Sequence, residues 1–240
     1  MTRTLYSLFF YCLLPLLLLR LLWRARKAPA YRQRWKERLA LYPAQAAPSG
    51  NTRTVVFHAV SVGEVHAAQP LIEKLLQARP ELTVVVTCTT PTGSARIRHL
   101  FGKRVQHVYL PYDLPGATVR FLKRFRPRVL VLLETELWPN LLHYCHKYDC
   151  KVILANARLS AISYSRYKRY PAMSRSMMEA LDCVAVQSRE DGERFALLGL
   201  SSGSIRVNGS LKFDVIMNPE KLQAARNLKA QWGGRPVWIA

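Results

Sequence analysis

Short apolar runs recur along most of the chain and alternate with stretches of helical periodicity. The runs have the length of strands and span Val55–Val60, Leu82–Cys88, Val105–Leu110, Val129–Leu133, Lys151–Ala155, Val184–Gln187 and Ile205–Val207. Helical patterns between them cover Glu64–Gln77, Thr118–Phe125, Tyr164–Leu181 and Arg189–Leu198. Several runs are apolar throughout, as expected when helices cover both faces of a parallel sheet. The alternation predicts a doubly wound, Rossmann-like α/β domain.

The chain begins with an apolar segment. Leu5–Leu19 contains no charged side chain, and after Arg20 the apolar run continues through Leu21–Trp23. About 20 apolar residues cross a bilayer as a helix, so residues 1–24 are predicted to form a membrane anchor. A helix that lies half-inserted in the membrane interface is the main alternative.

Positive residues flank the apolar segment unequally. Arg3 alone precedes it, whereas eight Lys and Arg residues follow within 20–38. Positive residues favour the cytoplasmic side, so the domain after the anchor is expected there. The same asymmetry disfavours a cleaved signal peptide.

The remaining chain divides into further expected units. Residues 25–53 form a basic juxtamembrane segment and a linker, whose part 40–53 is rich in Pro, Ala, Ser and Gly. The α/β domain is expected over 54–215, and a linker helix over 216–234. Residues 235–240 read as the first strand of a second domain that this chain does not contain.

The composition adds a strong positive charge to this picture. Lys and Arg number 36 against 15 Asp and Glu, so the formal net charge is +21. Such an excess indicates a polyanionic partner, which can be nucleic acid, an anionic membrane surface or a phosphorylated substrate. The five cysteines are scattered and odd in number, as is typical of reduced core residues in a cytoplasmic domain.

Ligands of open α/β sheets bind at the carboxyl ends of the strands, so chemistry is expected there. After the first strand, Gly63 permits a tight turn and Glu64 falls in the first helical turn. Glu64 either complements the helix dipole or acts as a general base, with Ser61 or His58 orienting it.

Hydroxyl groups follow the second strand. Thr92, Gly93 and Ser94 open the next helix, where free backbone N–H groups can cradle an anion and Arg96 adds a charge. The alternative is that Thr92 or Ser94 simply caps the helix.

Two glutamates follow the fourth strand, in the order Glu134-Thr-Glu136. Buried carboxylates need partners, and Arg158, after the next strand, is the candidate for a structural ion pair or a substrate contact. Lys212, after the last strand, either meets a carboxylate or phosphate between two domains or is an ordinary hinge residue.

Five segments together resemble one family closely. HAVSVGEV at 58–65, TTPTG at 89–93, ETELWPN at 134–140, NARLS at 156–160 and GSLKFD at 209–214 are similar to the Kdo (3-deoxy-D-manno-octulosonic acid) transferases of lipopolysaccharide biosynthesis. The anchor and RWKERL at 34–39 also fit, so the resemblance covers essentially the whole chain.

The resemblance implies the N-terminal, acceptor-binding half of a GT-B glycosyltransferase, attached to the cell inner membrane with its domain on the cytoplasmic side. Glu64 would be the catalytic base, and Kdo would pass from CMP-Kdo to a lipid A precursor (lipid IVA) with inversion. No cofactor or metal is expected. Acceptor contacts are expected from residues named above: Ser61, Thr92, Gly93, Ser94, Arg96, Glu136, Arg158 and Lys212. The donor-binding domain of the family is missing after residue 240, so this chain alone can be inactive.

Two other functions remain open. The chain can be a non-catalytic, membrane-bound remnant that binds lipid A precursor. A basic nucleic-acid-binding protein is the second, but the chain contains no recognisable binding motif and its positive residues gather beside the anchor. Nucleic acid is therefore not expected as a partner.

Overall fold

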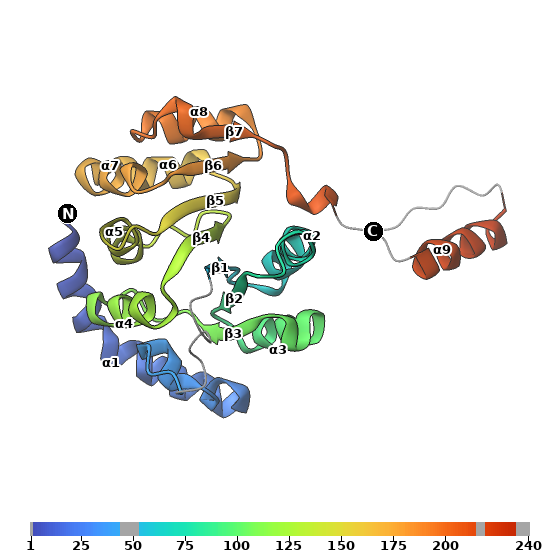
Figure 1. The fold of residues 1–240 in the computed structure, drawn as a ribbon, viewed down its shortest axis with the longest axis horizontal. Coiled ribbons are helices and arrows are strands. Elements are labelled where there is room, and N and C mark those ends of the chain that lie inside the picture. Colours follow the sequence, from blue (N-terminus) through green and yellow to red (C-terminus); the bar gives the residue numbers. More distant parts are fainter. Residues whose placement is uncertain (1, 44–52, 215–218, 234–240) are drawn as a thin grey trace.

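The structure is a computed structural model that describes residues 2–43, 53–214 and 219–233. Its centre is one parallel sheet of seven strands in the order β3-β2-β1-β4-β5-β6-β7 (Figure 1). The strands are β1 (Thr54–His58), β2 (Thr83–Cys88), β3 (Gln106–Tyr109), β4 (Pro127–Leu133), β5 (Lys151–Ala157), β6 (Cys183–Val186) and β7 (Ile205–Val207). The strand order changes direction between β1 and β4, and ligands of such sheets bind at this switch point.

Helices follow most strands. The α-helices are α1 (Arg3–Lys27), α2 (Val62–Ala78), α3 (Pro91–Phe101), α4 (Pro115–Phe125), α5 (Pro139–Lys147), α6 (Ala161–Lys168), α7 (Pro171–Glu179), α8 (Arg189–Leu197) and α9 (Pro219–Gln231). Short 3₁₀ turns are η1 (Pro29–Arg32), η2 (Trp35–Leu39), η4 (Gly102–Arg104), η5 (Ser202–Ser204) and η6 (Leu211–Asp214). Figure 1 shows α9 standing apart from the sheet.

The sheet separates two hydrophobic cores. Val56 of β1 faces the core under α4, α5 and α7, whereas its neighbours Val55 and Phe57 face the core under α2 and α3. Successive strand residues point to opposite faces, which explains why β1 is buried along its whole length. Continuously apolar strands were the basis for predicting a sheet covered on both faces, and the structure confirms that prediction.

Several element boundaries differ from the predictions, most of them by one to three residues. The helix expected over Tyr164–Leu181 is wrong: it is two helices, because Pro171 cannot continue α6 and instead begins α7. The first strand ends at His58 rather than Val60. The strand expected at 236–240, and most of the linker expected at 40–53, lie outside the described residues.

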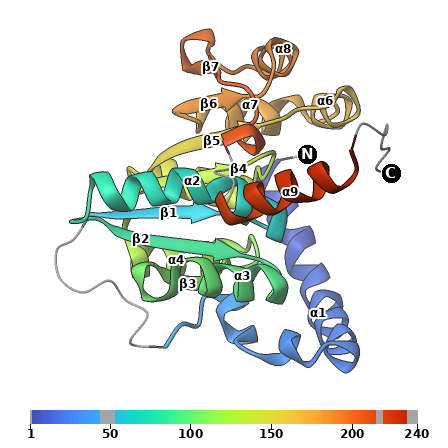
Figure 2. The ribbon, with the colours of Figure 1, turned by 90° about the vertical axis from the view of Figure 1, so that its right-hand side faces the viewer.

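Helix α1 lies against the domain and contacts α5 (Figure 1). Figure 2 shows it at the edge of the domain toward which the arrows of β1 and β2 point. Near its start, the Arg3 guanidinium and the Ser7 hydroxyl both donate to Oδ1 of the buried Asn140, each at 3.0 Å. Further along, Phe10 and Leu14 pack against the core under α4 and α5. The opposite face of α1 leaves seven large side chains more than half exposed: Leu5, Leu8, Phe9, Leu16, Leu19, Leu22 and Trp23. The helix is long and apolar enough to cross a membrane.

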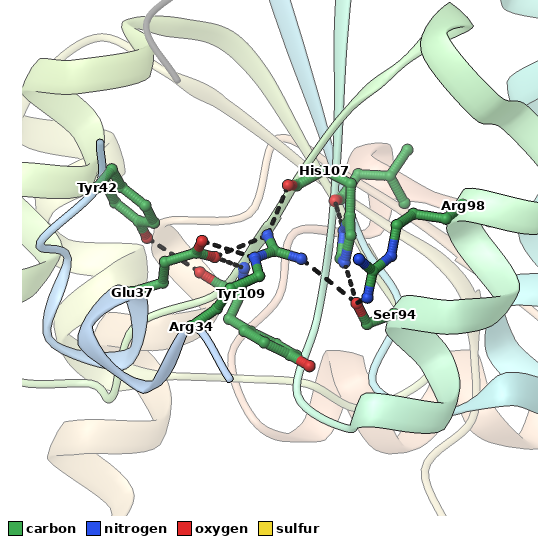
Figure 3. A network of polar contacts seen from close by, with 8 residues as sticks. Arg34, Glu37, Tyr42, Ser94, Arg98, His107 and Tyr109 are labelled. Carbon is green, nitrogen blue, oxygen red and sulfur yellow. Dashed lines mark hydrogen bonds and ion pairs between the residues drawn. The ribbon is translucent and has the colours of Figure 1, made fainter. Parts of the chain in front are cut away.

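The segment after α1 is fixed to the sheet edge by a network of polar contacts (Figure 3). The Arg34 guanidinium donates to both carboxylate oxygens of Glu37, at 2.7 and 2.8 Å, and to the His107 carbonyl. Glu37 is buried and also accepts the Tyr109 N–H of β3. Removing one partner of a buried pair costs about 3–5 kcal/mol, so this network holds residues 34–37 firmly on β3.

Candidate functional site

Three glutamates gather at the switch point of the sheet. Glu64 stands in the first turn of α2, directly after β1, while Glu134 and Glu136 follow β4. Strands β1 and β4 are paired, so their carboxyl ends lie side by side. The charge of Glu134 raises the pKa of Glu64, and the charges of Glu64 and Glu134 both raise the pKa of Glu136.

Glu64 is held by groups at the start of its own helix. Its carboxylate accepts the Val60 N–H at 2.9 Å and the Ser61 hydroxyl at 3.0 Å, while Ser61 Oγ accepts the Glu64 N–H at 3.3 Å. This reciprocal arrangement is a capping box, which is the structural role of such a glutamate. The prediction that Ser61 orients Glu64 agrees with these contacts.

The protonation of Glu64 is shaped by its surroundings. The described residues form no ion pair with it, and its side chain is half-buried. Burial raises the pKa of Glu64; the hydrogen bonds from Val60 and Ser61 oppose this shift, and the charge of Glu134 adds to it. A carboxylate with a raised pKa binds a proton more readily, which suits a general base.

Glu136 is the most perturbed of the three. Burial raises its pKa to about 7, with the Glu64 charge adding to the shift and the hydrogen bond from Trp138 Nε1 opposing it. Near neutral pH this group is therefore partly protonated. Arg158 was expected as a partner, yet it is exposed, and the described residues show no ion pair between it and Glu134 or Glu136. The alternative of a structural ion pair is thus wrong.

The loop between β2 and α3 lies against the turn that holds Glu64. The hydroxyls of Thr89 and Thr90 each donate to the Val60 carbonyl at 3.4 Å. Thr90 also caps α3 by accepting the Gly93 N–H, so capping by Thr92 or Ser94 is wrong.

Gly93 has a packing reason for its place in this loop. A Cβ at position 93 would meet Thr90 Oγ1 at 3.0 Å and the Cys88 Cβ at 3.4 Å. The Thr92 side chain is exposed, and its hydroxyl contacts that of Thr90. Thr92 and Gly93 thus lie at the start of α3, on the same edge of the sheet as Glu64.

Ser94 and Arg96 point to different neighbours. The Ser94 hydroxyl is buried and contacts Arg34, Arg98 and His107, so it belongs to the network on β3 (Figure 3). The half-buried Arg96 places Nη2 3.5 Å from His66 Nδ1 on α2, and its Nε has no hydrogen-bond partner among the described residues.

The structure also places His58, Gly63 and Lys212, and it contradicts the expectations for the first two. His58 does not orient Glu64: it is fully buried, its Nδ1 contacts Thr87 Oγ1, and burial lowers its pKa to about 4. Gly63 lies inside α2 without a positive φ, so no tight turn requires it. Lys212 is exposed in η6, a turn that packs against α2 and is tied to Asn156 through the Leu211 N–H.

Comparison with known proteins places this chain in a family. Residues 33–215 match the family model described as 3-deoxy-D-manno-octulosonic-acid transferase (kdotransferase). A 3-deoxy-D-manno-octulosonic acid transferase of Haemophilus influenzae is 40% identical over 89% of this chain and 50% of its own length. One from Bordetella pertussis is 38% identical over 99% of this chain and 55% of its own length. The chain belongs to the Kdo transferase family. It spans about half the length of these relatives.

Solved structures share the fold of this Kdo transferase chain. A UDP-GlcNAc 2-epimerase from Neisseria meningitidis, bound to UDP-GlcNAc, has a TM-score of 0.52 at 16% identity, covering 78% of this chain and 54% of its own. At this identity the likeness concerns the fold alone. The expected fold class, the Rossmann-like half of a GT-B glycosyltransferase preceded by one long apolar helix, is confirmed.

The family motifs located the strand ends of this chain but not all contacts around them. The sequence does not show that Glu134 lies near Glu64, or that Thr89 and Thr90 contact Val60. Pairing of β1 with β4 brings the first two together, and sequence spacing carries no signal of that pairing. Among the described residues no group of three or more His, Cys, Asp or Glu side chains is arranged to hold a metal ion. Metal-independent transfer stays a prediction.

Proposed function

We propose that this chain is the acceptor-binding and catalytic-base half of an enzyme that transfers Kdo from CMP-Kdo to a lipid A precursor. The observation that supports it most is the position of Glu64. This carboxylate is at the switch point of the sheet, is oriented by Val60 and Ser61, and has no cationic partner among the described residues. Its pKa is raised, so it binds a proton more readily than an exposed glutamate, as a group that takes a proton from a bound hydroxyl must.

In the proposed reaction, an acceptor hydroxyl gives its proton to Glu64 while its oxygen attacks the anomeric carbon of Kdo. The bond from that carbon to the phosphate oxygen breaks, CMP leaves, and the anomeric configuration inverts. Glu136, which is partly protonated near neutral pH, donates a hydrogen bond to the acceptor. Ser61, Thr92, Gly93, Arg96, Arg158 and Lys212 remain proposed acceptor contacts, whereas Ser94 acts through the network on β3. The donor-binding domain would complete the site.

The lipid acceptor and helix α1 together indicate the cytoplasmic face of the inner membrane. We place α1 in the plane of the interface rather than across the bilayer. Its contacts with the domain run from Arg3, at Asn140, to the buried Leu21 and Ala25. A spanning α1 would carry the polar Asn140 and Asp113 region into hydrocarbon, where polar groups without water are costly.

The transfer itself is tested by joining the chain to the second half of the Haemophilus influenzae relative. We expect Kdo to appear on lipid A precursor in vesicles only when CMP-Kdo and the lipid are both supplied. A joined enzyme that folds and binds both substrates, yet transfers nothing, would leave the non-catalytic alternative standing. Salt-dependent binding of DNA in preference to lipid vesicles would support the nucleic-acid alternative instead.

A further inference from the structure

A cationic cavity lies between α1, the segment after it and the loop between β2 and α3. Its volume is about 190 Å³. Three arginines, two threonines and two tyrosines supply its polar lining, together with two leucines of α1: Leu17, Arg20, Leu21, Arg24, Tyr31, Arg38, Thr89, Thr90 and Tyr112. The lining contains no acidic residue, and the described residues form no ion pair with Arg20, Arg24 or Arg38.

Arg38 gives the strongest indication that this cavity binds an anion. It is only 5% exposed, its Nη2 donates to the Thr89 carbonyl at 2.8 Å, and its Nε has no hydrogen-bond partner among the described residues. A buried guanidinium without an anionic partner is costly. A phosphate group offers several acceptor oxygens and pairs well with clustered arginines.

An apolar groove of about 370 Å³ adjoins this cavity. The two share Leu21 and Tyr31, and the groove runs along α1 between the helix and η1 and η2. Its lining consists mainly of apolar side chains: Leu18, Leu21, Leu22, Ala25, Tyr31, Arg32 and Trp35. Cationic and apolar cavities side by side, on a helix with an exposed apolar face, complement a molecule that carries both a phosphate and an acyl chain.

We propose that the two cavities bind one membrane lipid, with its phosphomonoester in the cationic cavity and an acyl chain in the groove. The assignment of this lipid as the acceptor rests on the proposed transfer function. Thr89 and Thr90 line the cationic cavity and also donate to the Val60 carbonyl, while the Val60 N–H holds Glu64. A phosphate bound here is therefore connected to the proposed base through Thr89, Thr90 and Val60, and it positions the acceptor sugar.

The test is flotation of the full 240-residue chain with vesicles of matched surface potential. One set carries phosphatidic acid, a second phosphatidylglycerol, and a third lipid A precursor, each in phosphatidylcholine. We expect about tenfold tighter binding to the two phosphomonoester lipids than to phosphatidylglycerol, the effect of one charge-assisted hydrogen bond. The variant Arg20→Gln/Arg24→Gln should lose this preference. Both arginines are exposed on α1, so folding is preserved.

The matched control is Lys103→Gln/Arg189→Gln, which removes the same charge at exposed positions outside the cavity and should keep the preference. Equal preference in the arginine variant and the wild type would overturn the proposal. So would complete competition by millimolar inorganic phosphate, because the lipid's acyl chain would then contribute nothing.

Preference for phosphatidic acid but not for lipid A precursor would overturn the assignment to the acceptor. Vesicle binding needs no turnover, so the cavity and the transfer function can fail separately. If vesicle binding does not depend on Arg20 and Arg24 while the joined enzyme transfers Kdo, only the cavity proposal is refuted. If binding depends on these arginines but the joined enzyme transfers no Kdo, only the transfer function is refuted.

Discussion

At the scale of single residues, the site is a cluster of carboxylates with unequal proton affinity. Glu64 keeps hydrogen bonds that favour its ionised form, whereas Glu136 is buried beside two other carboxylates and has a pKa of about 7. Like charges close together disfavour simultaneous ionisation. Glu136 retains a proton for part of the time near neutral pH, so it can donate a hydrogen bond, while Glu64 is the proposed proton acceptor.

The raised pKa of Glu136 predicts a pH-dependent loss of stability. Between the ordinary value of 4.5 and about 7, the folded chain binds more protons than the unfolded chain, so stability falls as pH rises through this window. Glu136→Gln removes this titration and keeps an acceptor for Trp138. We expect the variant to match the wild type at about pH 5 and to exceed it by about 2 kcal/mol at about pH 8, measured by denaturant unfolding.

The control for this measurement is Glu193→Gln, at an exposed glutamate of α8, which should change stability little at either pH. A Glu136→Gln variant whose stability relative to the wild type is the same at both pH values would contradict the buried, partly protonated state.

Two glycines of the family motifs have opposite expected responses. A methyl group at Gly93 meets Thr90 Oγ1 and Cys88, so Gly93→Ala should destabilise the domain by about 1–3 kcal/mol. At the exposed Gly63 the nearest contact is Ser61 Oγ at 3.8 Å, so Gly63→Ala should be neutral or slightly stabilising. Thermal unfolding of both variants tests the pair, and equal destabilisation would show that the Gly93 packing argument is wrong.

The sequence predicted some residue roles well because their partners are close along the chain. Ser61 and Glu64 are three residues apart, which is the spacing of a capping box. The contacts of Ser94 could not be predicted for the opposite reason, because its partners Arg34 and His107 come from distant segments. The orientation of His58 likewise depends on Thr87 of the neighbouring strand, which no local pattern reveals.

At the scale of elements, helix α1 is part of the fold and also exposes a long apolar face. Hydropathy predicted its length but not its packing, because a window of apolar residues does not show which face contacts the domain. The sequence likewise does not show which of the eight basic residues after the apolar run contact the domain. In the structure, Arg34 and Arg38 fix the segment to β3 and to the loop after β2.

An in-plane α1 predicts equal membrane depths along its exposed face. Single cysteines at Leu8, Leu16 and Leu22, in a chain with Cys12→Ser, can carry a fluorophore quenched by lipids of known depth. We expect similar, shallow depths for all three. A spanning helix rises about 1.5 Å per residue, so Leu16 would then lie near the bilayer centre, about 10 Å deeper than Leu8 and Leu22 on either side of it. A much deeper Leu16 would refute the in-plane position, and Glu193→Cys serves as the water-exposed reference.

At the scale of the whole molecule, the cationic cavity beside α1 and the carboxylate cluster at the switch point are connected through short contacts. The loop between β2 and α3 borders the cationic cavity beside α1 on one side and the turn of Glu64 on the other. The doubly wound pattern predicted the strand ends as the place of chemistry, and the sheet order confirms where those ends meet. How α1 closes one side of this edge could not be predicted, since it depends on packing between distant segments.

Replacing Glu64 in the joined enzyme tests the central claim most directly. Loss of a general base lowers turnover by about 10²–10⁴-fold, so Glu64→Gln should reduce kcat for Kdo transfer by at least about a hundredfold. Gln retains the size of the side chain and can still accept the Val60 N–H. The matched control is Glu73→Gln on the same helix, at a surface pair with Arg104, which should keep turnover near that of the wild type. A folded Glu64→Gln enzyme with near-normal kcat would contradict the account.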